Sequence, residues 1–194
     1  APIGVGQALR LAPIGMIGGF IGGFAEISYL SLLPNVALAS GGSDAEALSL
    51  LTMLAIGGGV LQLPIGWLAD KFDKTAISLL LAAAFVLASL VLPAALGSGV
   101  IGPLIVFLIG GIVLGFYTIG LSIIGERIPA KDIAAANAAF LIMYQSGAIL
   151  GPLATGAAMT LEPVTGFILT VSALMIVAAL GLWIIARGSS GVAP

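Results

Sequence analysis

Glu26 is the one ionisable side chain placed deep inside a long apolar stretch, "GMIGGFIGGFAEISYLSLLP". If this stretch crosses a membrane, a charge near its centre costs at least about 2.5 kcal/mol, so such residues face a cavity, pair with an opposite charge or stay protonated. No Lys or Arg lies at a comparable depth in the sequence. We therefore expect Glu26 to carry a proton or to bind a cation. The alternative is a protonated carboxyl group hydrogen-bonded to a neighbouring helix.

A second group of candidates consists of uncharged polar side chains in otherwise apolar stretches. Their donors and acceptors need partners in lipid, which either neighbouring helices or a bound substrate can supply. Three of them are spaced i, i+7 and i+8 and share roughly one face of a helix, so they are expected to line a cavity as a group. The candidates are Tyr29, Asn35, Gln62 and Tyr117, and the three on one face are Asn137, Tyr144 and Gln145.

The sequence lacks the residues needed for metal binding, cofactor binding, enzyme catalysis or nucleic-acid binding. The sequence has no Cys and no His, which removes disulfides, the commonest metal ligand and the usual axial ligand of haem. It contains no phosphate-binding glycine loop, no paired nucleophile and base, and no basic patch that could bind nucleic acid. We therefore expect neither an enzyme, nor a cofactor, nor a nucleic-acid partner.

The elements that must position these residues are membrane-spanning helices. Of the residues, 60% are hydrophobic and 7% charged, whereas soluble domains are about 45–50% apolar and about 25% charged. A helix needs roughly 20 apolar residues to cross about 30 Å of hydrocarbon. The sequence predicts an all-α protein with one six-helix domain over 1–194, whose spans are 14–38, 45–69, 75–95, 101–125, 133–160 and 164–186.

The basic residues predict the orientation of these spans. With six spans, all Lys and Arg fall in connections on one side, and the opposite connections hold only Asp44, Glu46 and Glu162. The positive-inside rule makes the basic side, with both chain termini, cytoplasmic. The basic residues are Arg10, Lys71, Lys74, Arg127, Lys131 and Arg187.

Helix ends and helix contacts are also marked in the sequence. Ser43 or Asp44 is expected to cap the second span, with Glu46 completing a capping box, and Asp132 to cap the fifth. Pro64 and Pro152 are expected to kink their helices. Glycines four residues apart permit close helix contacts or, less commonly, dimerisation. These glycine pairs are Gly18 and Gly22, Gly19 and Gly23, Gly111 and Gly115, and Gly147 and Gly151.

The stretch "GWLADKFDKTA" joins the second and third spans on the basic side. Its residues Gly66, Leu68, Ala69, Asp70, Lys71 and Lys74 resemble the cytoplasmic signature GxLaDrxGrk of the major facilitator superfamily. Asp73 departs from the pattern, because it occupies the usual position of a glycine. Aspartate adopts turn conformations more readily than most residues, so the turn can be kept.

A second stretch, "IGERIPAKDIAAANAAFLIMYQSGAILGPLATGAAM", is similar to the penultimate helix of a facilitator and the loop before it. It looks most like the carboxy-terminal half of bacterial drug-efflux-like members. The residues Gly147, Gly151 and Pro152 also resemble the antiporter motif of the family. That motif indicates antiport only in an amino-terminal half, so none is inferred for a carboxy-terminal one.

The resemblance implies a fold and a function. A facilitator has twelve helices in two halves, each a 3+3 inverted repeat, with substrate held between the halves. This sequence would supply one half, and we favour the carboxy-terminal half of a longer polypeptide over a half that assembles with a second copy or a different subunit. The implied function is secondary transport of a small solute by alternating access across a bacterial cytoplasmic membrane. Proton coupling through Glu26 is a separate expectation, which rests on the unpaired depth of this residue. The alternative is a facilitator-derived scaffold or assembly subunit without flux.

The resemblance also implies a gate. The matching aspartate of the family hydrogen-bonds the amino terminus of the penultimate helix, so Asp70 is expected to hold one conformation through an attraction of about 1 kcal/mol. Glu126, Arg127 and Lys131 lie nearby in the topology and could complete the network. The alternative is that these are solvated loop charges that only fix the orientation.

Overall fold

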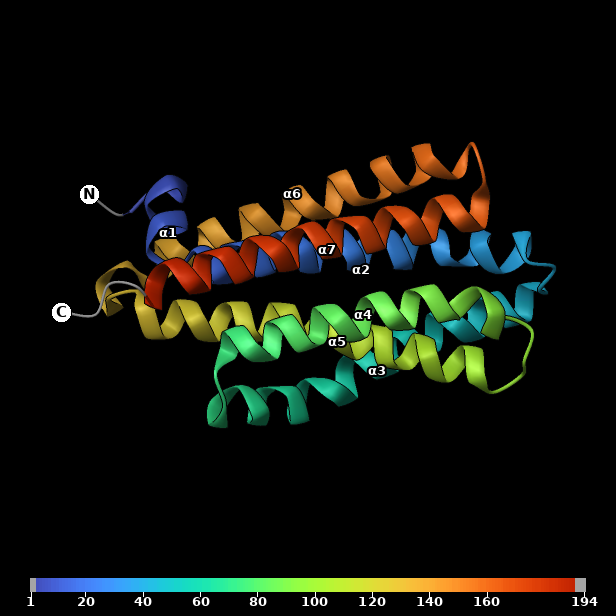
Figure 1. Cartoon of the computed structure of the whole chain (residues 1–194), viewed down its shortest axis with the longest axis horizontal. Helices are drawn as coiled ribbons and strands as arrows, with labels where there is room; N and C mark the ends of the chain where they lie inside the picture. The colour runs from blue at the N-terminus through green and yellow to red at the C-terminus, as the bar shows by residue number, and fades with distance from the viewer. Residues whose placement is uncertain (1–2, 191–194) are drawn as a thin grey trace.

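A computed structural model describes residues 3–190 of the chain, with side chains to residue 187, so the first two and last four residues of the expected domain lie outside it. Its long helices run up and down beside one another (Figure 1). The elements are α1 (Val5–Leu11), α2 (Pro13–Ala39), α3 (Asp44–Lys71), α4 (Lys74–Ala95), α5 (Ile101–Arg127), the 3₁₀ turn η1 (Ala130–Asp132), α6 (Ile133–Met159) and α7 (Pro163–Ser190).

Six of the described helices, α2 to α7, are long and apolar enough to cross a membrane. This confirms the all-helical fold with six spans. The sequence did not predict α1, because seven residues are too few to show a helical period. Its buried Ala8 belongs to a short helix that packs against α2 and α6.

The helix pair α2 and α5 forms the centre of the bundle. About 61% and 56% of their most apolar parts are buried, against 28 to 33% for the other four spans. Helices α4 and α7 pack on each other and cover one side of this pair, while α3 packs on α5 and α6 packs on α2. The side of the pair that lies between α3 and α6 is covered by no other described helix, and we call it the open face. The α3–α5 and α2–α6 contacts correspond to each other in a 3+3 repeat.

Glycines set the spacing of these two matching helix contacts. In the α2–α6 contact, a Cβ atom at Gly147 would overlap the Phe20 carbonyl oxygen, and one at Gly23 would overlap the Tyr144 carbonyl oxygen. In the α3–α5 contact, a Cβ atom at Gly57 would overlap the Phe107 carbonyl oxygen. The backbones therefore approach as closely as small residues permit in lipid.

The helix ends agree with the sequence at one position and correct it at another. Ser43 and Glu46 form a complete capping box at the start of α3. The Asp132 side chain makes no capping hydrogen bond, because η1 holds this residue at φ −108° and ψ −3°, away from the extended conformation of a capping residue. At α4 the cap is Asp73, whose Oδ1 accepts a hydrogen bond of 2.7 Å from the amide of Ala76.

The two expected kink sites, Pro64 and Pro152, both lie inside continuous helices, and α3 changes direction along its length (Figure 1).

All six basic residues lie at one end of the bundle. The α3–α4 and α5–α6 connections, α1 and the last turn of α7 meet at this end (Figure 1). Two of the cations stack on tryptophans: Lys71 Nζ lies 4.0 Å from the centre of the Trp67 ring, and the Arg187 guanidinium lies 3.8 Å from that of Trp183. We call this the basic end.

Candidate functional site

Glu26 lies in the middle of α2 and is half-buried. Tyr144 of α6 donates its hydroxyl proton to Oε2 of Glu26 over 2.6 Å. The bond is possible because the glycine contact between α2 and α6 brings the two backbones together on either side of it. A carboxylate that accepts a short hydrogen bond from a tyrosine has one partner and keeps further acceptor capacity.

A second tyrosine holds the first in place. The rings of Tyr117 of α5 and Tyr144 are edge-to-face with centres 5.5 Å apart, and Tyr117 packs in the same way on Phe140 at 5.2 Å. Such pairs add about 0.5–1.5 kcal/mol beyond the burial of their surface. Three helices therefore fix the position of the hydroxyl group that meets Glu26.

Beside Glu26 the open face holds a pocket of about 220 Å³. Its walls come from α2, α3 and α5, and Glu26 is the one residue with a polar side chain that lines it. The remaining lining residues are Leu30, Leu54, Ala55, Gly110, Val113 and Leu114. An apolar pocket with a single carboxylate suits a ligand that is mostly apolar and carries a positive charge, or a proton.

The structure corrects the expectation for Tyr29. Its side chain is 0% exposed, and its hydroxyl group lies 2.8 Å from Ser89 Oγ in a core formed by α2, α4 and α7. The rings of Phe85 and Phe167 pack edge-on against it. The prediction that Tyr29 lines a cavity is therefore wrong, because the bundle itself supplies the partner that the hydroxyl group needs.

The other polar candidates are only partly brought together. On α6, Asn137 and Gln145 are exposed and Tyr144 is half-buried against Glu26, so a shared role in lining a cavity stays a prediction. Gln62 is half-buried on α3, and Asn35 is exposed in the last part of α2.

Comparison with known proteins identifies the family. A family profile described as "Major Facilitator Superfamily" matches residues 15–192. The chain belongs to the major facilitator superfamily. Taken with the six apolar spans, this makes it an integral, multi-pass membrane protein.

Similar facilitators occur in enteric bacteria. An uncharacterised MFS-type transporter of Yersinia enterocolitica is 29% identical over 146 residues, which cover 75% of this chain and 37% of that protein. The uncharacterised MFS-type transporter YcaD of Escherichia coli is 29% identical over 144 residues, or 74% of this chain and 37% of that protein. The chain thus matches well under half the length of these relatives.

The facilitator signature lies at the basic end, where the described residues form one ion pair. Lys74 Nζ lies 2.6 Å from Glu126 Oε1, which joins the start of α4 to the end of α5. The Asp70 carboxylate is exposed and has no hydrogen-bond partner among residues 3–187, so the expected contact with the start of α6 is not formed in this conformation. Arg127 is exposed beside Glu126.

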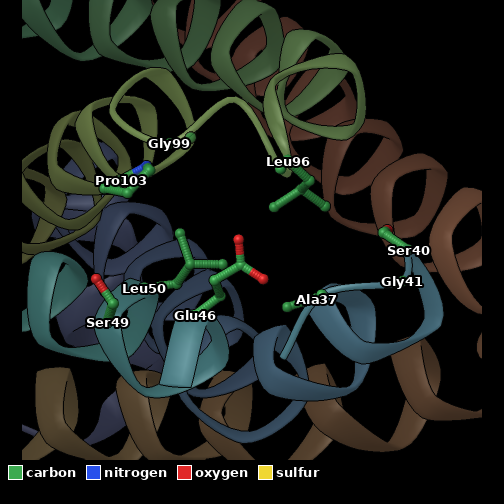
Figure 2. A pocket seen from close by; sticks show the side chains of 12 residues that line it. Ala37, Ser40, Gly41, Glu46, Ser49, Leu50, Leu96, Gly99 and Pro103 are labelled. Atoms are coloured by element: carbon green, nitrogen blue, oxygen red, sulfur yellow. The ribbon is translucent and has the colours of Figure 1, made fainter. Parts of the chain in front are cut away.

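A second pocket, of about 160 Å³, lies at the opposite end of this facilitator bundle, between the α2–α3 and α4–α5 connections (Figure 2). The carboxylate of Glu46 points into it (Figure 2). That carboxylate already accepts a hydrogen bond of 2.8 Å from the amide of Ser43. Glu46 is therefore explained by the capping box that the sequence predicts.

Proposed function

We propose that this chain forms one six-helix half of a facilitator-type secondary transporter and that Glu26 is its ion-coupling or cation-binding group. Transport would proceed by rocking of this half against a second one across the open face. The family, and relatives named as transporters, support this proposal. The orientation we propose puts the basic end in the cytoplasm of a bacterium, following the positive-inside rule.

The observation that carries the proposal is the placing of Glu26 on the open face. A carboxyl group within a span is costly, and here it lies beside an apolar pocket with one hydrogen bond instead of inside the closed core. Covering this face with a second half would enclose the pocket near the middle of the membrane, where facilitators hold substrate.

The proposed cycle uses the two charge states of one carboxyl group. As a carboxylate, Glu26 attracts a cationic substrate into the pocket, while the Tyr144 hydroxyl group holds the carboxylate in a fixed orientation. As a carboxylic acid, it no longer attracts the cation and can carry a proton across in its place. One group that binds either species in turn exchanges protons for substrate without a chemical reaction, so we propose no enzyme activity.

We further propose that Asp70 engages the penultimate helix in only one conformation of the cycle. Its exposed carboxylate is available for such a contact. Introduced cysteines on the open face report the inward and outward populations by their accessibility, and Asp70→Asn is expected to alter them. Unaltered populations would remove this part of the proposal.

The central claim is tested with the full-length protein in vesicles with an imposed pH gradient. The probe is tetraphenylphosphonium, a lipophilic cation, and Glu26→Gln is expected to abolish its uphill uptake. Glu46→Gln is the matched control, because glutamine also serves in a capping box. Uptake by Glu26→Gln equal to that of the wild type refutes the role of Glu26.

A measurement that needs no substrate supports the same test. Infrared difference spectra of the membrane-bound protein after a pH step should contain a carboxyl band that Glu26→Gln removes and Glu46→Gln keeps. A protein that shows neither uptake nor this band has no coupling carboxylate, and a scaffold role then replaces transport.

A further inference from the structure

The outer side of α4 and α7 carries an apolar groove of about 560 Å³. It is lined by residues of α4 between Leu79 and Leu87 and by residues of α7 between Met175 and Trp183. Every lining side chain is apolar except for the indole N–H group of Trp183. Helices α4 and α7 cover the side of the central pair opposite the open face. A second half packed on the open face would therefore leave the groove in contact with lipid.

The length of the groove matches one leaflet of the membrane. On each helix it extends over nine residues, whose ends lie about 12 Å apart along the helix axis, whereas the hydrocarbon core is about 30 Å thick. It begins one turn from the basic end, where α4 starts at Lys74 and α7 reaches Arg187. Another membrane-spanning helix would contact these helices over the full thickness. A groove of less than half that length fits an acyl chain instead.

A cation stands at the basic end of the groove. The guanidinium group of Arg187 lies 3.8 Å from the centre of the Trp183 ring, and Trp183 lines the groove. No carboxylate of the described residues pairs with Arg187. The ion pair that these residues form at this end joins Lys74 and Glu126. A guanidinium group binds phosphate through two parallel hydrogen bonds, and its stacking on the indole fixes its position.

We infer that the groove is a binding site for an anionic phospholipid, with one acyl chain between α4 and α7 and its phosphate held by Arg187. The site combines an apolar groove as long as one leaflet with the guanidinium group of Arg187 at the level of the lipid headgroups. It does not depend on the proposed transport, since neither Glu26 nor the open face takes part.

The two tryptophans of the sequence make the site measurable. Trp67→Phe leaves Trp183 as the only tryptophan of this sequence, and brominated phosphatidylglycerol and brominated phosphatidylcholine then compete to quench its fluorescence. Trp183→Phe leaves Trp67, which stacks with Lys71 at the same end but does not line the groove. We expect Trp183 to prefer the anionic lipid more strongly than Trp67 does.

Two substitutions test the binding of the lipid headgroup and the binding of the acyl chain separately. Arg187→Gln is expected to lower the anionic preference at Trp183 about fivefold, the effect of one cationic side chain near anionic lipid. Ala179→Phe fills the groove and is expected to reduce quenching of Trp183 by both lipids. Ala173→Phe is the control, because Ala173 is exposed on the same helix outside the groove.

Three outcomes would overturn the inference. Equal preferences at Trp183 and Trp67 would mean a general attraction to the basic end. A preference that Arg187→Gln and Ala179→Phe leave unchanged would mean that neither the cation nor the groove takes part. Failure of both lipids to quench Trp183 would mean that another protein segment covers the groove.

Discussion

Tyr29 and Tyr144 both lie within spans, yet their hydroxyl groups meet different partners on different sides of α2. Tyr29 points toward α4 and α7, where Ser89 is its partner in a closed aromatic core. Tyr144 points from α6 toward the open face, where its partner is the carboxylate of Glu26 beside a pocket. The Tyr29 hydroxyl group bonds to the uncharged Ser89, and both side chains are fully buried. The Tyr144 hydroxyl group is bonded to a group that can change its charge.

The comparison separates polar residues that hold the bundle together from those available for chemistry. In lipid, every buried donor needs a partner, so a polar side chain within a span is not by itself a sign of function. A carboxyl group that borders a pocket is a stronger sign, because its burial remains costly unless a ligand or proton offsets the charge. The following variants test this distinction, from the largest expected effect to the smallest.

Gly147→Ala should disturb the α2–α6 contact, across which Tyr144 reaches Glu26. The added Cβ atom would overlap the Phe20 carbonyl oxygen, which belongs to the backbone and cannot move aside by a change of rotamer. Overpacking commonly costs about 1–3 kcal/mol, and we expect about 3 kcal/mol of unfolding free energy here. Denaturation of the reconstituted protein in SDS measures the loss. Gly156→Ala on the same helix is the control, since nothing lies within 4 Å of its Cβ position; equal stabilities of the two variants would contradict the close contact.

Tyr144→Phe and Tyr29→Phe should have opposite profiles. Hydrogen bonds to charged groups are worth about 1.5–3 kcal/mol, so Tyr144→Phe is expected to reduce pH-driven tetraphenylphosphonium uptake about tenfold. Tyr29→Phe should leave uptake unchanged and lower stability by about 1 kcal/mol, because Ser89 loses its partner. Uptake and SDS denaturation, measured on both variants, show which tyrosine serves transport and which serves stability. Reduced uptake in Tyr29→Phe alone would reverse the assignment of the two sides.

Thr155→Val should have the smallest effect. Thr155 Oγ1 lies 3.3 Å from Ser28 Oγ in the α2–α6 contact, and Ser28 also donates to the Phe24 carbonyl oxygen at 2.7 Å. Ser28 therefore keeps a partner, and a hydrogen bond between membrane helices averages about 0.6 kcal/mol. The same SDS titration should show a loss near this value, without a change in uptake. A loss as large as that of Gly147→Ala would mean that hydroxyl groups, and not glycines, hold this contact.

Much of the fold could be predicted because its signals are local. Six apolar stretches, the grouping of basic residues and the Ser43–Glu46 capping box each depend on residues close in sequence. The expected cap at Asp132 was wrong, since Asp132 ends a 3₁₀ turn that sets its backbone, and this turn was not predicted from the sequence. The Asp73 cap was missed, although the amide three residues later is the usual partner of a capping aspartate.

Less of the site could be predicted. The depth of Glu26 marked it in the sequence, but Tyr144 and Tyr29 are both tyrosines within apolar spans, and nothing local separates their roles. The pocket residues Leu54 and Gly110 carry no signal at all, because an ordinary apolar residue becomes a pocket wall only through the helix that faces it.

The sequence alone determined how many helices cross the membrane, which ends of them carry positive charge and where an unpaired carboxyl group lies in depth. These features follow from the free-energy cost of placing polar groups in hydrocarbon. For each segment this cost depends on the residues of that segment alone. Only the tertiary structure decided that Tyr144 reaches Glu26, that Tyr29 does not face the pocket and that α4 and α7 leave a groove beside Arg187. These depend on how one helix is rotated against another, and that rotation is set by close packing between residues far apart in the chain.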